Sequence, residues 1–340
     1  MHKYFFSVSM LMISTIIYAQ EPQFAVVRPD GTTIICPSWD SAYKKSTTGD
    51  KIYLPKGTFN TSSTPINKTL HLIGVGINED SSQTIGITVV DNIDLYTFSS
   101  NSTIENIKVN GGIRGHGLTS GDTIINIKLR NIEINGPISH YGAIGSVIFS
   151  KMAIVNSIIR NIEGILENSI ISNCVMLGNY SFGGKNNLFS NNIFFQPQTG
   201  QLYIASFSII KNNIFQNEMV TTQNSTIQNN FGQFFNHTYF NNIVSNHLGF
   251  KCFNDIFISS GETPWPCYFS YSRNNNYRLK PTSGGKNSGT DGTDVGLYGG
   301  LFPWDDSGQY STPVIYHKKV GPNSTSDGKL KVEYKVRAGN

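Results

Sequence analysis

Short runs of alternating apolar and polar residues recur along most of the chain. Each run contains an asparagine that is followed directly by an apolar residue. The recurring phrase reads ENIKVN (Glu105–Asn110), RNIEIN (Arg130–Asn135), RNIEGI (Arg160–Ile165), SNCVML (Ser172–Leu177), NNIFFQ (Asn191–Gln196), NNIFQN (Asn212–Asn217), NNFGQF (Asn229–Phe234) and NNIVSN (Asn241–Asn246). Alternation puts one face of a strand inside. The pattern therefore predicts pairs of short strands separated by a polar corner.

Asparagine suits such a corner because it tolerates left-handed backbone geometry, and stacked asparagine amides can hydrogen-bond to one another. One repeat cannot bury its apolar face alone, so the repeats are expected to stack into a parallel β-solenoid with loops of unequal length. The alternative is an antiparallel β-sandwich, but Asn110-Gly111 and Asn135-Gly136 do not form part of a consistent hairpin pattern.

The two ends of the chain differ from the repeats. Ser38 is expected to cap a short helix that carries Trp39, Ala42 and Tyr43 and covers the first coil. Near the other end, Lys329–Ala338 alternates as one half-buried strand.

The first residues have the pattern of a secretory signal peptide, with His2 and Lys3 before an apolar run from Tyr4 to Tyr18. That run is too short to span a bilayer, so no membrane span is expected. We predict a signal peptide at 1–19, a β-helix domain at 20–300 and an extension with one or two strands at 301–340. The protein is then secreted or displayed on the cell surface.

Composition narrows the possible partners. Charged residues are 14% of the chain and the net charge is +4, without a clustered basic stripe, so nucleic acid is not an expected partner. Four cysteines allow three pairings; Cys252 and Cys267, which flank one loop-like segment, are the favoured pair, and Cys174 is expected to be a buried thiol.

Several segments carry a family resemblance. GDKIYLPKGTF (Gly49–Phe59), LHLIGVG (Leu70–Gly76) and STIENIKVNGG (Ser102–Gly112), in that order after a short helix, closely resemble pectin-lyase-like β-helix proteins. NNYRLKPTSGGKNSGTDGTDVGLYGG (Asn275–Gly300) resembles the closing segment of secreted bacterial β-helix repeat proteins. The resemblance implies an all-β, right-handed parallel β-helix with an N-terminal capping helix and a C-terminal closing segment. It does not fix an activity, because the fold hosts several.

Enzymes of the family act on polysaccharides in a groove on the outer face of a sheet. The hydrolase set of paired aspartates is missing from the coil, and His116, in Gly115-His116-Gly117, is interpreted as a loop histidine. The best lyase candidates are Arg130 and Arg160, with Glu133 and Glu163 at the same offset; they are expected to stack on one face, either as a functional patch or as a solvated ion-pair ladder.

Weaker candidates lie elsewhere. Trp265 and Lys185 could contact a sugar, although most aromatic side chains are expected in the core. Asp291 and Asp294 could bind a cation such as Ca²⁺ or simply cap a glycine-rich turn. No cofactor is expected, because no acidic cluster accompanies them.

Because the catalytic sets are missing, these observations favour a non-catalytic β-helix that binds a glycan or has a structural role at the cell exterior. The competing hypothesis is a polysaccharide lyase or glycoside hydrolase acting in an outer groove. A monomer is expected, with a trimeric adhesin-like β-helix as the alternative.

Overall fold

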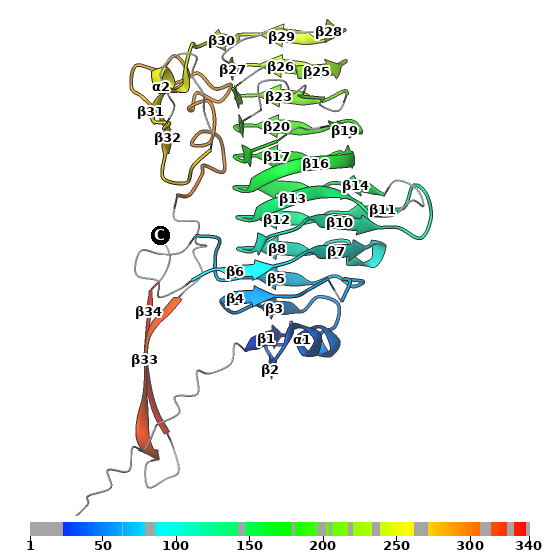
Figure 1. Ribbon diagram of the computed structural model, residues 1–340, viewed down its shortest axis with the longest axis vertical. Helices are drawn as coiled ribbons and strands as arrows, with labels where there is room; N and C mark the ends of the chain where they lie inside the picture. Colours follow the sequence, from blue (N-terminus) through cyan, green and yellow to red (C-terminus); the bar gives the residue numbers. More distant parts are fainter. Residues whose placement is uncertain are drawn as a thin grey trace, which may run out of the picture.

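The computed structural model describes residues 23–62, 64–78, 86–141, 147–178, 181–195, 202–203, 206–216, 220–232, 239–261, 271–306, 314–324 and 330–337. The expected signal peptide at 1–19 lies outside this set. The described chain is an all-β protein whose strands stack coil upon coil into one long column (Figure 1).

The first sheet runs the length of the column. In spatial order its strands are β2 (Thr33–Cys36), β1 (Phe24–Val27), β3 (Lys51–Tyr53), β5 (His71–Ile73), β8 (Thr103–Glu105), β12 (Lys128–Arg130), β15 (Ala153–Val155), β17 (Ile170–Ser172), β20 (Leu188–Ser190), β23 (Ile209–Lys211), β26 (Thr226–Gln228) and β29 (Ile243–Ser245). From β3 to β29 every neighbouring pair is parallel, as a solenoid requires.

The second sheet closes the other sides of the coils. Its strands are β4 (Gly57–Phe59), β6 (Thr88–Val90), β7 (Ile93–Tyr96), β9 (Lys108–Val109), β10 (Ile113–His116), β11 (Thr123–Ile125), β13 (Glu133–His140), β14 (Ile148–Ser150), β16 (Ile158–Glu167), β18 (Val175–Met176), β19 (Ser181–Gly183), β21 (Ile193–Phe194), β22 (Leu202–Tyr203), β24 (Ile214–Phe215), β25 (Val220–Gln223), β27 (Phe231–Gly232), β28 (Tyr239–Phe240) and β30 (Leu248–Gly249). These strands also pair in parallel, which rules out the antiparallel sandwich.

Each first-sheet strand from β8 to β29 lies between two residues with positive φ, five positions apart. The leading corners are Asn101, Asn126, Lys151, Asn168, Asn186, Phe207, Asn224 and Asn241. The trailing corners are Asn106, Asn131, Asn156, Asn173, Asn191, Asn212, Asn229 and Asn246. Asparagine fills most of these positions because it is the non-glycine residue best suited to the left-handed region. The expectation of asparagine corners is confirmed.

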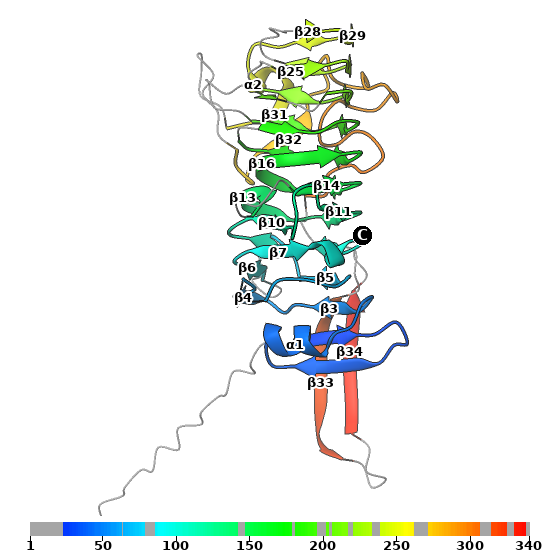
Figure 2. The same cartoon turned by 90° about the vertical axis from the view of Figure 1, so that its right-hand side faces the viewer.

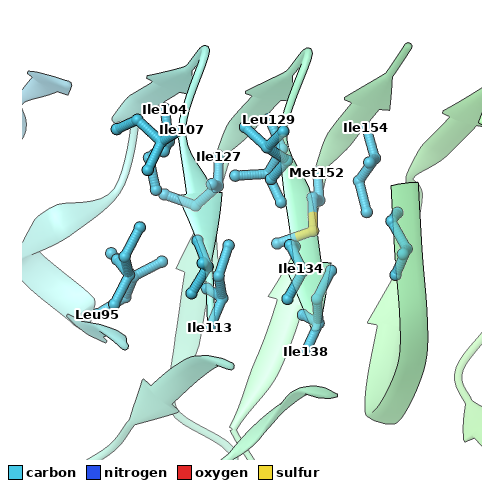
Figure 3. Close-up of a cluster of buried hydrophobic side chains, with 14 of the residues drawn as sticks. Leu95, Ile104, Ile107, Ile113, Ile127, Leu129, Ile134, Ile138, Met152 and Ile154 are labelled. Carbon is cyan, nitrogen blue, oxygen red and sulfur yellow. The ribbon is translucent and has the colours of Figure 1, made fainter. Parts of the chain in front are cut away.

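Aliphatic side chains fill the lower coils. The middle residue of each first-sheet strand points inward, and residues such as Ile104, Leu129 and Ile154 are at most 1% exposed. Figure 3 shows them meeting the side chains of Leu95, Ile113, Ile134 and Ile138 from the second sheet. Stacking coil on coil thus buries a continuous apolar core.

In the upper coils, amides replace aliphatic groups just inside the trailing corner. Ile107 and Ile132 hold this position below, whereas Asn192, Asn213 and Asn230 hold it above, all fully buried. Each of these amides accepts a hydrogen bond from the backbone N–H one coil below: Cys174 to Asn192, Asn192 to Asn213, and Asn213 to Asn230, each at 2.9 Å. Each also donates to a strand carbonyl of that coil. The ladder therefore satisfies the backbone groups that the corner leaves outside the sheet.

A short helix and a hairpin lie at the N-terminal end of the column (Figure 2). Helix α1 (Trp39–Lys45) begins at Ser38, whose side chain accepts a hydrogen bond from the Ser41 N–H, as expected, and it buries Trp39 and Ala42 against β1 and β2. The antiparallel pairing of β1 with β2 and β3 was not expected from the sequence.

The C-terminal part of the coil domain runs back along the side of the column. Beyond α2 (Phe253–Ile256), β31 (Phe257–Ser259) and β32 (Asn276–Leu279), the chain descends as the returning segment, residues 284–304 (Figure 1). Trailing-corner amides bind it one coil at a time: Asn229 donates to the Ser288 carbonyl, Asn212 to Thr290, Asn191 to Gly296, Asn173 to Leu297 and Gly299, and Asn156 to Pro303. The returning segment thus follows the side of the coils, where it contacts five corners in succession.

The returning segment creates a second core on the outer face of the second sheet. Ile158, Val175 and Ile193, which point out of the coil, are buried there under Val295 and Leu297. The aromatic residues Phe253, Phe257 and Tyr277 complete this cluster.

The last part of the chain forms its own small sheet. Strands β33 (Val314–Ser324) and β34 (Leu330–Arg337) pair antiparallel with each other. The predicted strand near the C-terminus is therefore present, and its partner is β33. No helix among the described residues has both the length and the apolar character needed to cross a bilayer.

A partly buried carboxylate, that of Asp91, connects two loops of the lower coils and makes stability depend on pH. Asp91 accepts hydrogen bonds from the Thr61 N–H at 2.6 Å and from the Ser62 hydroxyl. Burial alone would raise the pKa of Asp91, but these hydrogen bonds outweigh it and lower the pKa from 3.8 to about 2. Because the folded-state pKa is the lower one, the contribution is complete above about pH 4 and is lost as the pH falls towards 2.

We expect Asp91→Asn to remove this part of the pH dependence. Urea denaturation at pH 5, 4, 3 and 2 should show a shallower loss of stability below pH 4 in the variant than in the parent protein. Parallel curves for the two proteins would contradict the assignment.

Candidate functional site

A groove crosses the outer face of the first sheet over its lower coils. It has a volume of about 550 Å³ and spans strands β3, β5, β8, β12 and β15. Five adjacent strands at a spacing of about 4.8 Å extend roughly 19 Å along the column. An elongated ligand lying along the axis therefore meets side chains from each coil in turn.

Two rows of outward-facing residues build the groove, because successive residues of a strand point to opposite faces. In one row Lys51, His71, Thr103, Lys128 and Ala153 lie in register. In the other, Ile73, Glu105, Arg130 and Val155 lie in register. Phe302 of the returning segment, 44% exposed, adds an aromatic face to the lining.

The groove carries excess positive charge. Its lining includes Lys51, Lys128 and Arg130 against a single carboxylate, Glu105. Glu105 and Arg130 are cross-strand neighbours, an arrangement that favours their mutual attraction. Higher up the same face the first row continues as the apolar residues Ile170, Leu188 and Ile209, and the second row as Ser172, Ser190 and Lys211, so the concentration of charge lies on β3 to β12.

The structure does not bring the predicted arginine pair together. Arg130 ends β12 in the first sheet, whereas Arg160 lies within β16 of the second sheet. The residue in register with Arg130 is Val155, and Asn156 is the next trailing corner. The stacking prediction is wrong because the two RNIE phrases occupy different positions in their coils.

The two glutamates are separated for the same reason. Glu133 faces Lys108 at 3.0 Å and pairs with Arg273 of the C-terminal part, so it is held in an ion-pair cluster. Glu163 is in register with Ser181 on another part of the second sheet.

His116 belongs to a compact polar cluster, so its interpretation as a loop histidine is wrong. It lies at the end of β10, where its ring stacks between Tyr96 and Tyr141 at centroid distances of 4.9 and 4.6 Å. Its Nε2 is 3.0 Å from Asp94, a side chain only 4% exposed. Arg114 donates to both oxygens of that carboxylate at 2.6 and 2.7 Å.

This cluster follows from strand register. Tyr96 pairs with His116, and Asp94 with Arg114, across the parallel strands β7 and β10. The bidentate hydrogen bond to Asp94 raises the pKa of Arg114, so the guanidinium group stays protonated. A histidine held by a buried carboxylate is an arrangement that also serves in acid–base catalysis.

The remaining predicted residues lie apart from the groove. Asp291 accepts hydrogen bonds from Thr293, and Asp294 pairs with Lys286 at 2.6 Å, so both carboxylates stabilise the turn. Among the described residues no three potential metal ligands gather. Lys185 is exposed beside a leading corner, near Ser206.

The cysteine predictions are met in part. Cys36 and Cys174 are buried free thiols, and burial raises the pKa of Cys174 to about 12. Cys252 is disulfide-bonded. Cys267 and Trp265 lie outside the described residues, so the pairing with Cys267 and the role of Trp265 stay predictions.

Sequence reasoning missed Lys51, His71, Lys128 and Phe302 in the groove. The first three share a strand position that a coil-by-coil alignment of the repeats would have revealed. Phe302 carries no such signal, because it reaches the groove through the returning segment. No family model, curated protein or solved structure matches this chain.

Proposed function

We propose that this protein is a secreted β-helix that binds an acidic glycan, without catalysis, along the groove on the first sheet. The observation that carries the proposal is the in-register row of Lys51 and Lys128, with Arg130 beside it, across an open groove. Positive charges repeated along an axis complement a polymer whose carboxylates also repeat.

The side chains that line the groove favour binding over hydrolysis. Glycoside hydrolysis uses two carboxyl groups on either side of the scissile bond. Glu105 is the single carboxylate among the residues that line the groove. The exposed ring of Phe302 offers an apolar face on which a sugar ring can stack.

Titration with polygalacturonate, a model acidic polymer, tests the proposal. We expect calorimetry to show binding that weakens as salt rises above about 0.15 M, where screening acts within about 8 Å. Lys128→Glu should weaken binding about tenfold or more, because it replaces a positive charge of the groove, beside Arg130 on β12, by a negative one.

Lys185→Glu is the matched control, since it makes the same charge change at an exposed lysine outside the groove. Equal losses in the two variants would show that net charge alone drives binding and would contradict a built site. Equal binding of neutral dextran would contradict the acidic specificity.

The cluster around His116 supports a second proposal from the enzyme class, a polysaccharide lyase. His116, with its Nε2 held by Asp94, would take through Nδ1 the proton on the carbon next to a uronate carboxyl group. A carbon–carbon double bond would form as the bond to the leaving oxygen breaks, and that oxygen would take a proton from water. The titration mixtures decide between the two: unsaturated products that disappear with His116→Ala would replace the binding proposal by the lyase proposal.

Three further features belong to the proposal. Right-handed coiling is supported by the strong preference of parallel crossover connections for that hand. A covering role for α1 is supported by its packing at the end where the sheet would otherwise leave an open edge. The proposed monomer is checked by light scattering, which would show three chains for the adhesin-like alternative.

A further inference from the structure

A second, smaller cavity lies between the returning segment and the lower coils. This seam pocket has a volume of about 230 Å³, and Tyr271, Tyr277, Tyr298, Trp304, Arg278 and Asp306 line it, with Asn78 from the loop after β5. Pockets for drug-sized ligands measure about 300–1,000 Å³. The seam pocket is therefore the size for one small ring rather than for a chain.

Aromatic faces make up much of its wall. Tyr271 and Tyr277 stack with ring centroids 5.6 Å apart and planes 16° from parallel. The Arg278 guanidinium lies 4.3 Å from the centre of the Tyr298 ring. These contacts hold the three tyrosine rings in fixed positions, so the wall does not have to reorder when a ligand binds.

A connected set of planar polar groups shares the pocket. Asp306 accepts a hydrogen bond from the Tyr298 hydroxyl at 2.5 Å and pairs with Arg278 at 2.5 Å. Burial, with the nearby Asp306, raises the pKa of Tyr298, so its hydroxyl stays protonated and can donate. The side chains of Arg278 and Asp306 are about half exposed, which leaves room for a ligand to bind them from the open side.

The charges of the pocket are balanced, unlike those of the groove. Arg278 is neutralised by Asp306, and Arg273 by Glu133. A carboxylate ligand would have to compete with these existing partners for the guanidinium groups. Hydroxyl groups, which both donate and accept, can add to the pairs without breaking them.

We propose that the seam pocket binds a single neutral sugar unit, with its C–H face on the aromatic wall and its hydroxyls on Asp306, Arg278 and the neighbouring asparagines. This site is distinct from the groove, although the two are close. Phe302 lines the groove and Trp304 lines the pocket, and Pro303 between them is bound by the corner residue Asn156 at 3.5 Å.

Saturation-transfer NMR and calorimetry on the full chain test the assignment with the methyl glycosides of glucose, galactose and mannose. We expect millimolar binding of at least one of them, and no comparable binding of methyl galacturonate by the Lys128→Glu variant, whose groove is impaired. Trp304→Ala should weaken that binding about tenfold or more, whereas Leu301→Ala, at a side chain 88% exposed that lines neither the pocket nor the groove, should leave it unchanged.

Asp306→Asn provides a second variant on a half-exposed side chain, which separates loss of the site from loss of the fold. It should weaken sugar binding while the near-ultraviolet circular dichroism stays that of the parent protein. No binding by any of the three glycosides, a preference for the uronate in the Lys128→Glu variant, or binding that survives both Trp304→Ala and Asp306→Asn would overturn the proposal.

The outcome is independent of the acidic-glycan proposal. Lys128→Glu should affect polygalacturonate and not the neutral glycosides, and Trp304→Ala should do the reverse. Each proposal can therefore fail while the other stands.

Discussion

Asn213→Ala is expected to lower the free energy of unfolding by about 3–5 kcal/mol, because it breaks the buried amide ladder in its middle. The Asn213 side chain donates to the Phe189 carbonyl at 2.9 Å and accepts from the Asn192 N–H at 2.9 Å. Both backbone groups are buried, and an unsatisfied buried group costs about 1–3 kcal/mol. Alanine also leaves a cavity at a fully buried position.

Equilibrium denaturation in urea, followed by circular dichroism, measures this loss. Asn126→Gly is the control, because Asn126 is a corner with φ of 59° at which glycine is unstrained. It should change stability by no more than about 0.5 kcal/mol. A loss in Asn213→Ala no larger than that of the control would show that the inner ladder does not support the coils.

Gly296→Ala is expected to detach part of the returning segment. Gly296 has φ of +86°, and an added Cβ would lie 2.5 Å from Cδ1 of Ile214. The clash comes where the segment lies on Asn191 and on the second core around Val295. We expect a loss of about 2–4 kcal/mol, combining left-handed strain with overpacking.

Limited proteolysis with mass spectrometry locates the effect, and Gly292→Ala separates its two causes. Gly292 has φ of +79° but nothing within 4 Å of an added Cβ, so it shares the strain without the clash. Cleavage within residues 284–304 should rise clearly in Gly296→Ala and only slightly in Gly292→Ala. Equal cleavage of the two variants would refute a packing role for Gly296.

The repeats could be recognised in the sequence because the constraint that produces them acts within each coil. A left-handed corner followed by an inward residue constrains each coil separately, so asparagine recurs and the solenoid can be predicted. However, the two asparagines of the phrase Asn191–Gln196 have different roles, which the sequence pattern does not distinguish. Asn191 is a corner, whereas Asn192 belongs to the inner ladder. The sequence pattern cannot separate them until the register of the coils is known.

Register also explains the errors at the candidate site. The interval between successive trailing corners varies from 17 to 25 residues, so equal phrases need not be equal positions. Arg130 and Arg160 stand in the same four-residue phrase, but they lie 30 residues apart, whereas the trailing corners Asn131 and Asn156 lie 25 apart. The two arginines therefore fall at different positions of their coils. His116 joins Tyr96 and Tyr141 through the same register, which is visible only after the strands are paired.

The seam pocket and one wall of the groove were beyond sequence reasoning for a different reason. Both depend on contacts between residues more than a hundred positions apart, such as Asn156 with Pro303 and Asn173 with Leu297. Backbone carbonyls accept most of these hydrogen bonds, so the partner residues carry no side-chain signature.

The constant separation of five residues between leading and trailing corners has a consequence for how such a chain can change. One residue inserted within that arc would turn Ile210 and its equivalents outward and expose the core. The arc through the second sheet, from a trailing corner to the next leading one, already varies between 12 and 20 residues. Length changes there are absorbed within a single coil, so new loops can be grafted onto that side while the first sheet keeps its register and its outward-facing rows.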